Sequence, residues 1–233
     1  MSGPPGFSIP EPAVVLTDLG LAFLGAYLGR RLWTAPGGGL LQRKGVLVIA
    51  GLASAAFWGA IFHAFFPANT TTPSGFIAWI PVMLSILVVA ATLLELCLRV
   101  LGPGLPPLAR RSIVATYAAG FAAVVLLVDE SFSTIVRFYA PTLVLFLIAA
   151  ARQAIRSRSA GWTLIAVSLI LSGVAALLQQ AAVSIHPVYF DHNALYHVFQ
   201  GIALVLLYLG FRRAPAAPAE PYASGTDPTP RQG

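Results

Sequence analysis

The chain of 233 residues carries 58% hydrophobic and only 9% charged side chains, and its mean hydropathy is +0.81. Soluble domains hold about 45–50% apolar and about 25% charged residues, so this composition excludes a soluble globular fold. The net charge of +6 does not indicate nucleic-acid binding, because the basic residues stand singly or in pairs beside apolar segments. We therefore expect an all-α integral membrane bundle that contacts membrane lipid and no nucleic acid.

Seven apolar segments are long enough to cross a bilayer, which takes about 20 helical residues. They cover residues 13–33, 45–66, 75–101, 111–128, 131–151, 161–185 and 191–211. They predict a seven-helix transmembrane domain over residues 13–213, after a short external segment, 1–12. Residues 214–233 are rich in Pro, Ala, Gly and Thr, which predicts a disordered cytoplasmic tail.

The Lys and Arg residues predict the orientation of the bundle. They occur in alternate connections: after the first, third, fifth and seventh apolar segments. Positive residues accumulate in short cytoplasmic loops, so we expect the N-terminus outside and the C-terminus in the cytoplasm. The many Ala residues and the excess of Arg over Lys fit a GC-rich bacterial genome, and hence an inner (plasma) membrane protein.

Polar side chains gather near the predicted outer face. Ionisable residues inside membrane segments are costly, so they are candidates for function. The set includes all four histidines and consists of Asp18, His63, Asp129, Glu130, Arg137, His186, Asp191, His192, Asn193 and His197. We expect Arg137 to pair with Asp18, Glu130 or Asp191, because an unpaired guanidinium inside the membrane would be expensive.

The first functional hypothesis is a zinc site. His63 and His197 would be the main ligands, and His192, Asp191 or Asp18 would be the third, which leaves one position for water. Asp18 could then act as the catalytic group that accepts the proton of this water. A site near the outer interface would receive a lipid-like substrate. The supporting polar network would consist of Asn193, Arg137, Asp129 and Glu130.

Two stretches carry a family resemblance: FWGAIFH, which ends at His63, and HNALYHVFQG, which begins at His192. They resemble the alkaline ceramidase and adiponectin/progestin receptor superfamily of seven-helix membrane hydrolases. In that superfamily a Ser-x-x-x-His, an Asp and a His-x-x-x-His bind zinc. The resemblance implies that His63 and His197 are zinc ligands of a lipid amidase. Gly59 stands at the position of the motif Ser, and Asn193 at that of the first motif His of the last helix.

Two other classes stay open. A pH-responsive protein could titrate a cluster of His63, His197, Asp18, Asp129 and Glu130. Alternatively, a structural or assembly subunit could use its His and Asp side chains only as a hydrogen-bond network. A retinal protein is excluded, because the single lysine lies at the start of the second apolar segment and the last one offers no amine.

Overall fold

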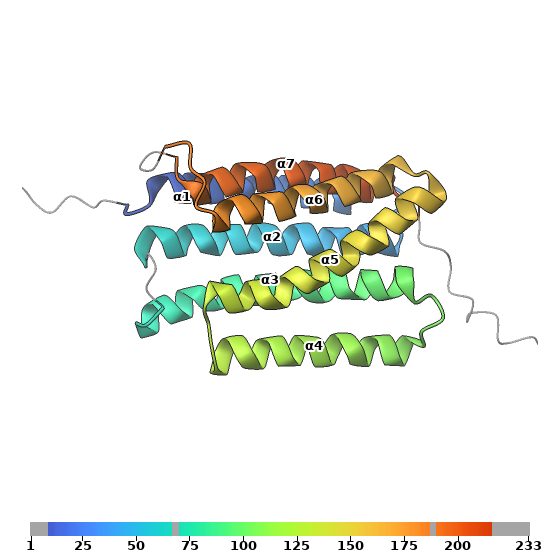
Figure 1. Cartoon of the computed structure of the whole chain (residues 1–233), viewed down its shortest axis with the longest axis horizontal. Coiled ribbons are helices and arrows are strands. Elements are labelled where there is room, and N and C mark those ends of the chain that lie inside the picture. Colours follow the sequence, from blue (N-terminus) through green and yellow to red (C-terminus); the bar gives the residue numbers. More distant parts are fainter. Residues whose placement is uncertain (1–8, 67–69, 187–189, 216–233) are drawn as a thin grey trace, which may run out of the picture.

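The computed structural model describes residues 9–66, 70–186 and 190–215, and within these ranges the chain forms seven helices and no sheet (Figure 1). All seven are long and apolar enough to cross a membrane, which confirms the predicted all-α membrane bundle. The helices are α1 (Pro12–Trp33), α2 (Leu40–Phe65), α3 (Pro73–Leu101), α4 (Pro107–Leu127), α5 (Phe132–Ser157), α6 (Ala160–Gln180) and α7 (His192–Arg213). The tail predicted to be disordered lies outside the described residues from 216 on, and so do residues 1–8.

Several helix ends differ from the predicted segment ends. At the basic end α2, α4, α5 and α7 extend beyond the apolar segments, because long basic side chains reach water while their backbone stays helical. At the other end, α6 stops at Gln180 rather than at residue 185. The amide of Val183 bonds to the carbonyl of Leu178 at 3.0 Å, and Ala182 adopts a left-handed conformation with φ of 53°, which ends the helix.

Six helices close into a ring and the seventh lies outside it. Neighbours around the ring pack in the order α1, α2, α3, α5, α6, α7 and back to α1. Helix α4 contacts only α3 and α5, and its buried residues are Arg110, Phe121 and Val125 alone. The chain thus brings its first and last helices together, while α4 lies at the edge of the bundle (Figure 1).

Two groups of buried apolar side chains form the core. The larger joins α1, α2, α3, α5, α6 and α7 around residues such as Trp162, Phe146 and Phe211. The smaller joins α2, α3, α4 and α5 around Met83 and Phe121. The ring of Phe121 stacks on that of Phe138 with centroids 4.9 Å apart, and this contact holds α4 against α5.

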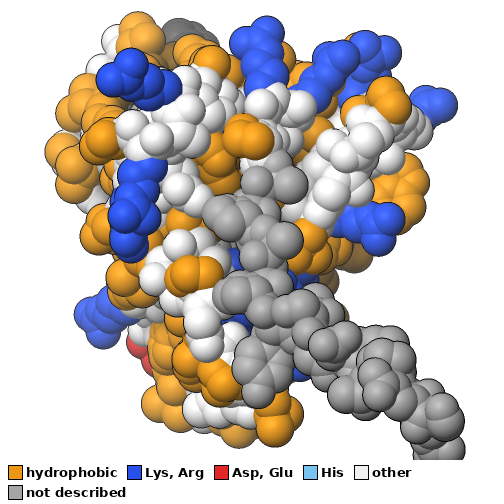
Figure 2. Space-filling view, turned by 90° about the vertical axis from the view of Figure 1, so that its right-hand side faces the viewer, with side chains coloured by type: hydrophobic (Ala, Val, Ile, Leu, Met, Phe, Trp, Pro, Cys, Tyr) orange, Lys and Arg blue, Asp and Glu red, His pale blue; other side chains and the backbone are white. Residues whose placement is uncertain are grey.

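The basic residues surround one end of the bundle, which Figure 2 views end on. Every Lys and Arg of the described helices and connections except Arg137 belongs to this end, where α1, α3, α5 and α7 finish and α2, α4 and α6 begin. We call it the basic end. Lys44 of α2 bonds to Glu95 of α3 at 2.5 Å, and Arg99 bonds to the same carboxylate at 2.9 Å. Glu95 and Arg99 pair one turn apart on α3, and Lys44 makes this ion pair a link between two helices.

Candidate functional site

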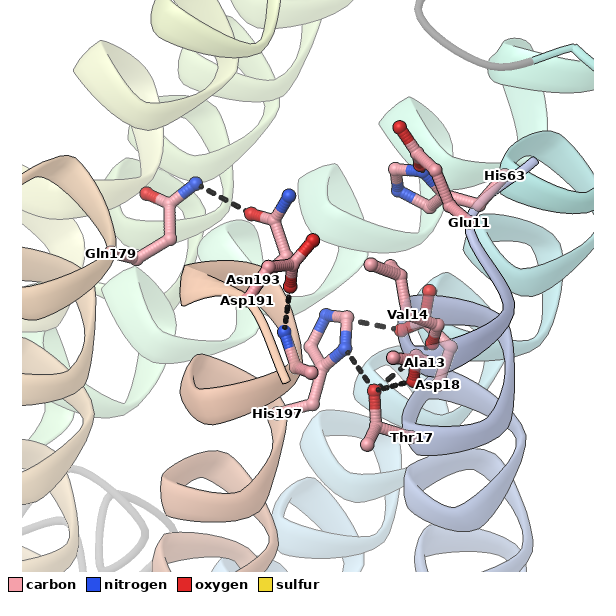
Figure 3. Close-up of polar contacts among 11 residues, drawn as sticks. Glu11, Ala13, Val14, Thr17, Asp18, His63, Gln179, Asp191, Asn193 and His197 are labelled. Atoms are coloured by element: carbon pink, nitrogen blue, oxygen red, sulfur yellow. Dashed lines mark hydrogen bonds and ion pairs between the residues drawn. The ribbon is translucent and has the colours of Figure 1, made fainter. Parts of the chain in front are cut away.

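The candidate site lies at the end of the bundle opposite the basic end. There α1 begins, α2 finishes and α7 begins, and Figure 3 shows side chains from these three helices pointing toward one another. Helix α1 packs against both α2 and α7, so its polar residues can reach partners on either side. The predicted gathering of polar residues at one end is therefore found in the structure.

Helix α1 supplies two carboxylates to this site. Glu11 is its N-cap residue, and Asp18 follows seven residues later. Seven residues are close to two helical turns, so the two side chains share one face and differ in depth by about 10.5 Å. Asp18 is buried, with 4% of its surface exposed. An isolated carboxylate in such a place would be costly, so its partners decide its chemistry.

His197 of α7 is the partner of Asp18. Its Nε2 atom lies 3.2 Å from Oδ1 of Asp18, and its Nδ1 atom lies 3.0 Å from Oγ1 of Thr17. The side chains of His197 and Asp18 are only 12% and 5% exposed. Both ring nitrogens therefore have partners on α1, and the imidazole is locked between the first and last helices (Figure 3).

The contacts of Thr17 bear on how many protons this pair holds. The Thr17 hydroxyl donates to the carbonyl of Ala13 or Val14, at 2.9 and 3.0 Å. A hydroxyl has only one proton to donate, so when Thr17 donates to one of these carbonyls it accepts from an N–H at Nδ1 of His197. A proton then lies between Nε2 and Asp18, on one atom or the other, because two acceptors would repel. In either form the buried pair as a whole is neutral, which is the least costly state away from water.

His63 of α2 pairs with the other carboxylate. Its Nδ1 atom is in contact with a carboxylate oxygen of Glu11. The side chains of His63 and Glu11 are 25% and 34% exposed, so this pair is in contact with the surroundings while the pair of Asp18 and His197 is not.

Gly59 lies beside Asp18, one turn before His63 on α2. A Cβ atom added at Gly59 would be 3.1 Å from Oδ2 of Asp18, which is tighter than ordinary contact. The absence of a side chain therefore gives the carboxylate room between α1, α2 and α7. Gly59 thus faces the Asp18 carboxylate across the contact of α1 with α2.

The start of α7 uses two further candidate residues for structure. Asp191 caps the helix by accepting from the amide of Ala194 at 2.8 Å. Asn193 accepts a hydrogen bond of 3.1 Å from Gln179 of α6. His192 is the first residue of α7 and belongs to neither His–carboxylate pair. These bonds fix the register of α7 and thereby the position of His197.

The remaining candidates lie apart from the histidines, around the connection of α4 to α5. Asp129 accepts from the Thr134 hydroxyl and from the amide of Ser131, the latter at 3.0 Å. The hydrogen bond from Thr134 is the main cause that lowers the pKa of Asp129, followed by the bonds from Ser131. Glu130 accepts from Thr70 at 3.2 Å. This group therefore anchors a loop and does not reach His63 or His197.

The predicted ion pair of Arg137 is not formed with any carboxylate in the described part of the chain. Arg137 is exposed on α5, and the acidic residue on which it acts electrostatically is Asp129. The expected partners were Asp18, Glu130 and Asp191. That expectation assumed that Arg137 points into the bundle, whereas its exposed position lets the guanidinium extend to the interface.

The three-ligand metal site is likewise not assembled among the residues that the structure describes, where no three His, Cys, Asp or Glu side chains are placed to hold one ion. His63 and His197 each face a carboxylate instead of sharing a point between them. Zinc binding by His63, His197 and a third ligand stays a prediction. Nothing in the arrangement requires a metal to satisfy these side chains.

Sequence reasoning missed two members of the site, Glu11 and Thr17. Glu11 was assigned to the external segment because it precedes the apolar run, yet its spacing from Asp18 places both on one helical face. Thr17 was overlooked because a threonine inside a helix usually bonds only to its own backbone. The preference of a buried imidazole for two partners is the signal that could have pointed to it.

Residues 13–216 match a protein family described as "Family of unknown function (DUF6962)". No curated protein and no solved structure matches the chain. The matched range spans all seven helices and contains Thr17, Asp18, Gly59, His63 and His197, although not Glu11. On this match, the chain belongs to the DUF6962 family.

Proposed function

We propose that this protein is a pH-responsive seven-helix membrane protein, in which proton binding by the buried pair of Asp18 and His197 controls the packing of α1 against α7. The observation that carries the proposal is the bonding of His197, whose two ring nitrogens both face partners on α1 in a buried place. One proton shared by Asp18 and His197 is then part of the contact between the first and last helices.

The direction of the response follows from the charges. If the shared proton leaves as pH rises, the Nε2 lone pair faces the Asp18 carboxylate and a net negative charge remains in an apolar place. The contact of α1 with α7 should then weaken.

Other titratable groups face the buried pair and would modulate it. They come from the same three helices: His63 and Asp191 act electrostatically on His197, and Tyr196 interacts with Asp18. The neighbouring helix α6 contributes the uncharged Gln179, which bonds to Asn193. The response thus belongs to a coupled cluster rather than to a single histidine.

Hydrogen exchange in lipid nanodiscs tests the proposal. Backbone amides at the start of α1 and α7 are compared between about pH 5 and about pH 9, after correction for the intrinsic exchange rate. Protection should fall as pH rises in the wild type, and Asp18→Asn should remove most of this change. His192→Gln is the matched control, because His192 belongs to neither pair. The proposal would be excluded if protection in the wild type did not depend on pH. It would also be excluded if the Asp18→Asn variant kept the pH dependence of the wild type.

A zinc-dependent hydrolase with a lipid-like substrate is the second candidate. It is supported by the placement of His63, His197 and Asp18 at one end of the bundle and by the resemblance of their flanking motifs. Metal binding would require both histidines to leave their present partners. Metal analysis of the purified protein by mass spectrometry decides: stoichiometric zinc that is lost in both His63→Ala and His197→Ala supports the hydrolase, and a metal-free wild type excludes it.

We also propose that the basic end faces the cytoplasm of a bacterial cell and that the candidate site opens to the outside. The support is the restriction of Lys and Arg to one end of the described bundle, which matches the usual bias of cytoplasmic loops.

A further inference from the structure

A groove lies between α1 and α2 on the outside of the bundle, near the basic end. It holds about 300 Å³, and on α1 it is lined by Gly25, Ala26, Gly29, Arg30 and Trp33. Val46 and Ala50 of α2 form the other wall. The groove takes no part in the candidate site, which lies at the opposite end of the same two helices.

Small residues give the groove its depth. Gly25 packs so closely on α2 that an added Cβ atom would lie 2.7 Å from Cβ of Ala53. Gly29 has no side chain to fill the space, and Ala26 and Ala50 present single methyl groups to the outside. The two helices therefore meet at their backbones and leave a channel with apolar walls along the line of contact.

The groove runs from the membrane interface toward the bilayer interior. Trp33 is the last residue of α1 and is 69% exposed, as expected for an aromatic residue at the headgroup level. Gly25 lies eight residues before it, so the groove extends about 12 Å along the helix. Arg30 stands near the mouth, and its long side chain can carry the guanidinium to the interface.

The charges at the mouth are all positive. Residues 28–44 include four basic side chains and no Asp or Glu. No described carboxylate forms an ion pair with Arg30, which is exposed, whereas Lys44 is occupied by Glu95. The apolar channel can hold a hydrocarbon chain, and the exposed guanidinium above it can bind a phosphate. A phospholipid carries these two groups in the same order.

We propose that the groove binds an anionic phospholipid, with one acyl chain between α1 and α2 and its phosphate on Arg30. Charge complementarity selects the anionic headgroup, since a zwitterionic lipid would bring a second, cationic group to the basic mouth. The small residues of α1 set the fit of the chain. The inference does not depend on the proposed pH response.

Native mass spectrometry of the full chain in detergent tests this site. The protein is delipidated and titrated with phosphatidylglycerol or with phosphatidylcholine of the same chain length. The wild type should retain one phosphatidylglycerol in preference to phosphatidylcholine. Arg30→Gln should weaken binding of phosphatidylglycerol by about fivefold, because one basic contact contributes about 1 kcal/mol. Ala26→Leu, which fills the groove from an exposed position, should weaken both lipids.

Arg43→Gln is the matched control, because Arg43 is an exposed basic residue at the same end that does not line the groove. It should leave lipid retention unchanged. Equal retention of the two lipids by the wild type would overturn the proposal. So would an Arg43→Gln loss as large as that of Arg30→Gln, since lipid would then bind by general attraction to the basic end. Thermal unfolding of each variant verifies that the fold is kept.

Discussion

Glu11 and Asp18 lie two turns apart on one face of α1, and each faces an imidazole that comes from a different neighbouring helix. The pair of Glu11 and His63 is half-exposed, and the pair of Asp18 and His197 is buried. Helix α1 is thereby fastened to α2 near its start and to α7 farther in. Substitutions in the two pairs should have unequal effects, which the first prediction uses.

His197→Leu should lower the free energy of unfolding by about 1–3 kcal/mol, because it leaves the Asp18 carboxyl buried without a hydrogen-bond partner. His63→Leu should lower it by no more than about 1 kcal/mol, because Glu11 can turn to water. Unfolding by a denaturing detergent, followed by circular dichroism, measures both. Similar losses in the two variants would contradict the difference in burial.

Asp18→Asn tests the shared proton. An amide donates one hydrogen bond to Nε2 of His197, as a protonated carboxyl would, so we expect this variant to lie within about 1 kcal/mol of the wild type at neutral pH. Asp18→Leu removes the donor and should cost about 1–3 kcal/mol more, since Nε2 is left unsatisfied. If Asp18→Asn were as damaging as Asp18→Leu, the pair would hold a charge that an amide cannot replace.

The loss of stability on substituting Gly59 should depend on whether the new side chain carries a hydroxyl. The added Cβ of Gly59→Ala would crowd Oδ2 of Asp18, so we expect a loss of about 1 kcal/mol. Gly59→Ser brings the same crowding with a hydroxyl that can donate to the carboxylate, and should recover about half of this loss. Unfolding in detergent compares the two variants, and Gly20→Ala is the control because its Cβ would meet nothing within 4 Å. A serine variant less stable than the alanine variant would contradict the assigned contact.

The loop between α4 and α5 should show an acid-sensitive stability. In the folded protein the pKa of Asp129 is lowered, chiefly by the hydrogen bond from the Thr134 hydroxyl. At pH values above the ordinary pKa of an aspartate, the ionised carboxylate therefore stabilises the fold. This stabilisation is lost as pH falls through the lowered pKa. In Thr134→Val the melting temperature should therefore fall less as the pH is lowered than it does in the wild type. Ser133→Ala should leave it unchanged, because Ser133 bonds to Ser131 and not to Asp129.

The orientation can be tested with reporters. An alkaline phosphatase fusion after Arg213 should be inactive and a fluorescent protein at the same place should be bright, as expected for a cytoplasmic end. An accessible cysteine introduced at Thr71, in a variant that lacks Cys97, should react with a membrane-impermeant reagent from outside. The reverse pattern would place the candidate site in the cytoplasm.

The membrane fold could be predicted because the sequence encodes it in long apolar runs separated by charged and proline-rich connections. Their ends were less predictable, since the basic residues just beyond them, such as Arg43 and Arg152, stay inside helices and extend their side chains to water. Position at one end of the bundle was also predictable for His63, Asp18 and His197, because depth follows from counting residues along a helix.

Pairing among these side chains was not predictable in the same way. Depth along a helix says nothing of rotation about its axis, so equal depth for His63 and His197 permitted a shared ion but did not require one. The packing of α1 between α2 and α7 decides which carboxylate each imidazole meets. Arg137 illustrates the same limit, because its depth suggested a partner while its rotation gives it an exposed position.

The contact of Thr17 with His197 joins residues 180 positions apart, on the first and last helices of the chain. A ribosome delivers α1 to the membrane long before α7 exists. During that interval the side chain of Asp18 has no imidazole beside it, and the ring of helices stays open between α1 and α6. Assembly of the bundle is therefore completed only when the final segment is inserted. A nascent chain that stops before His197 leaves the polar side chains of Thr17 and Asp18 without this partner, and quality-control machinery can recognise them.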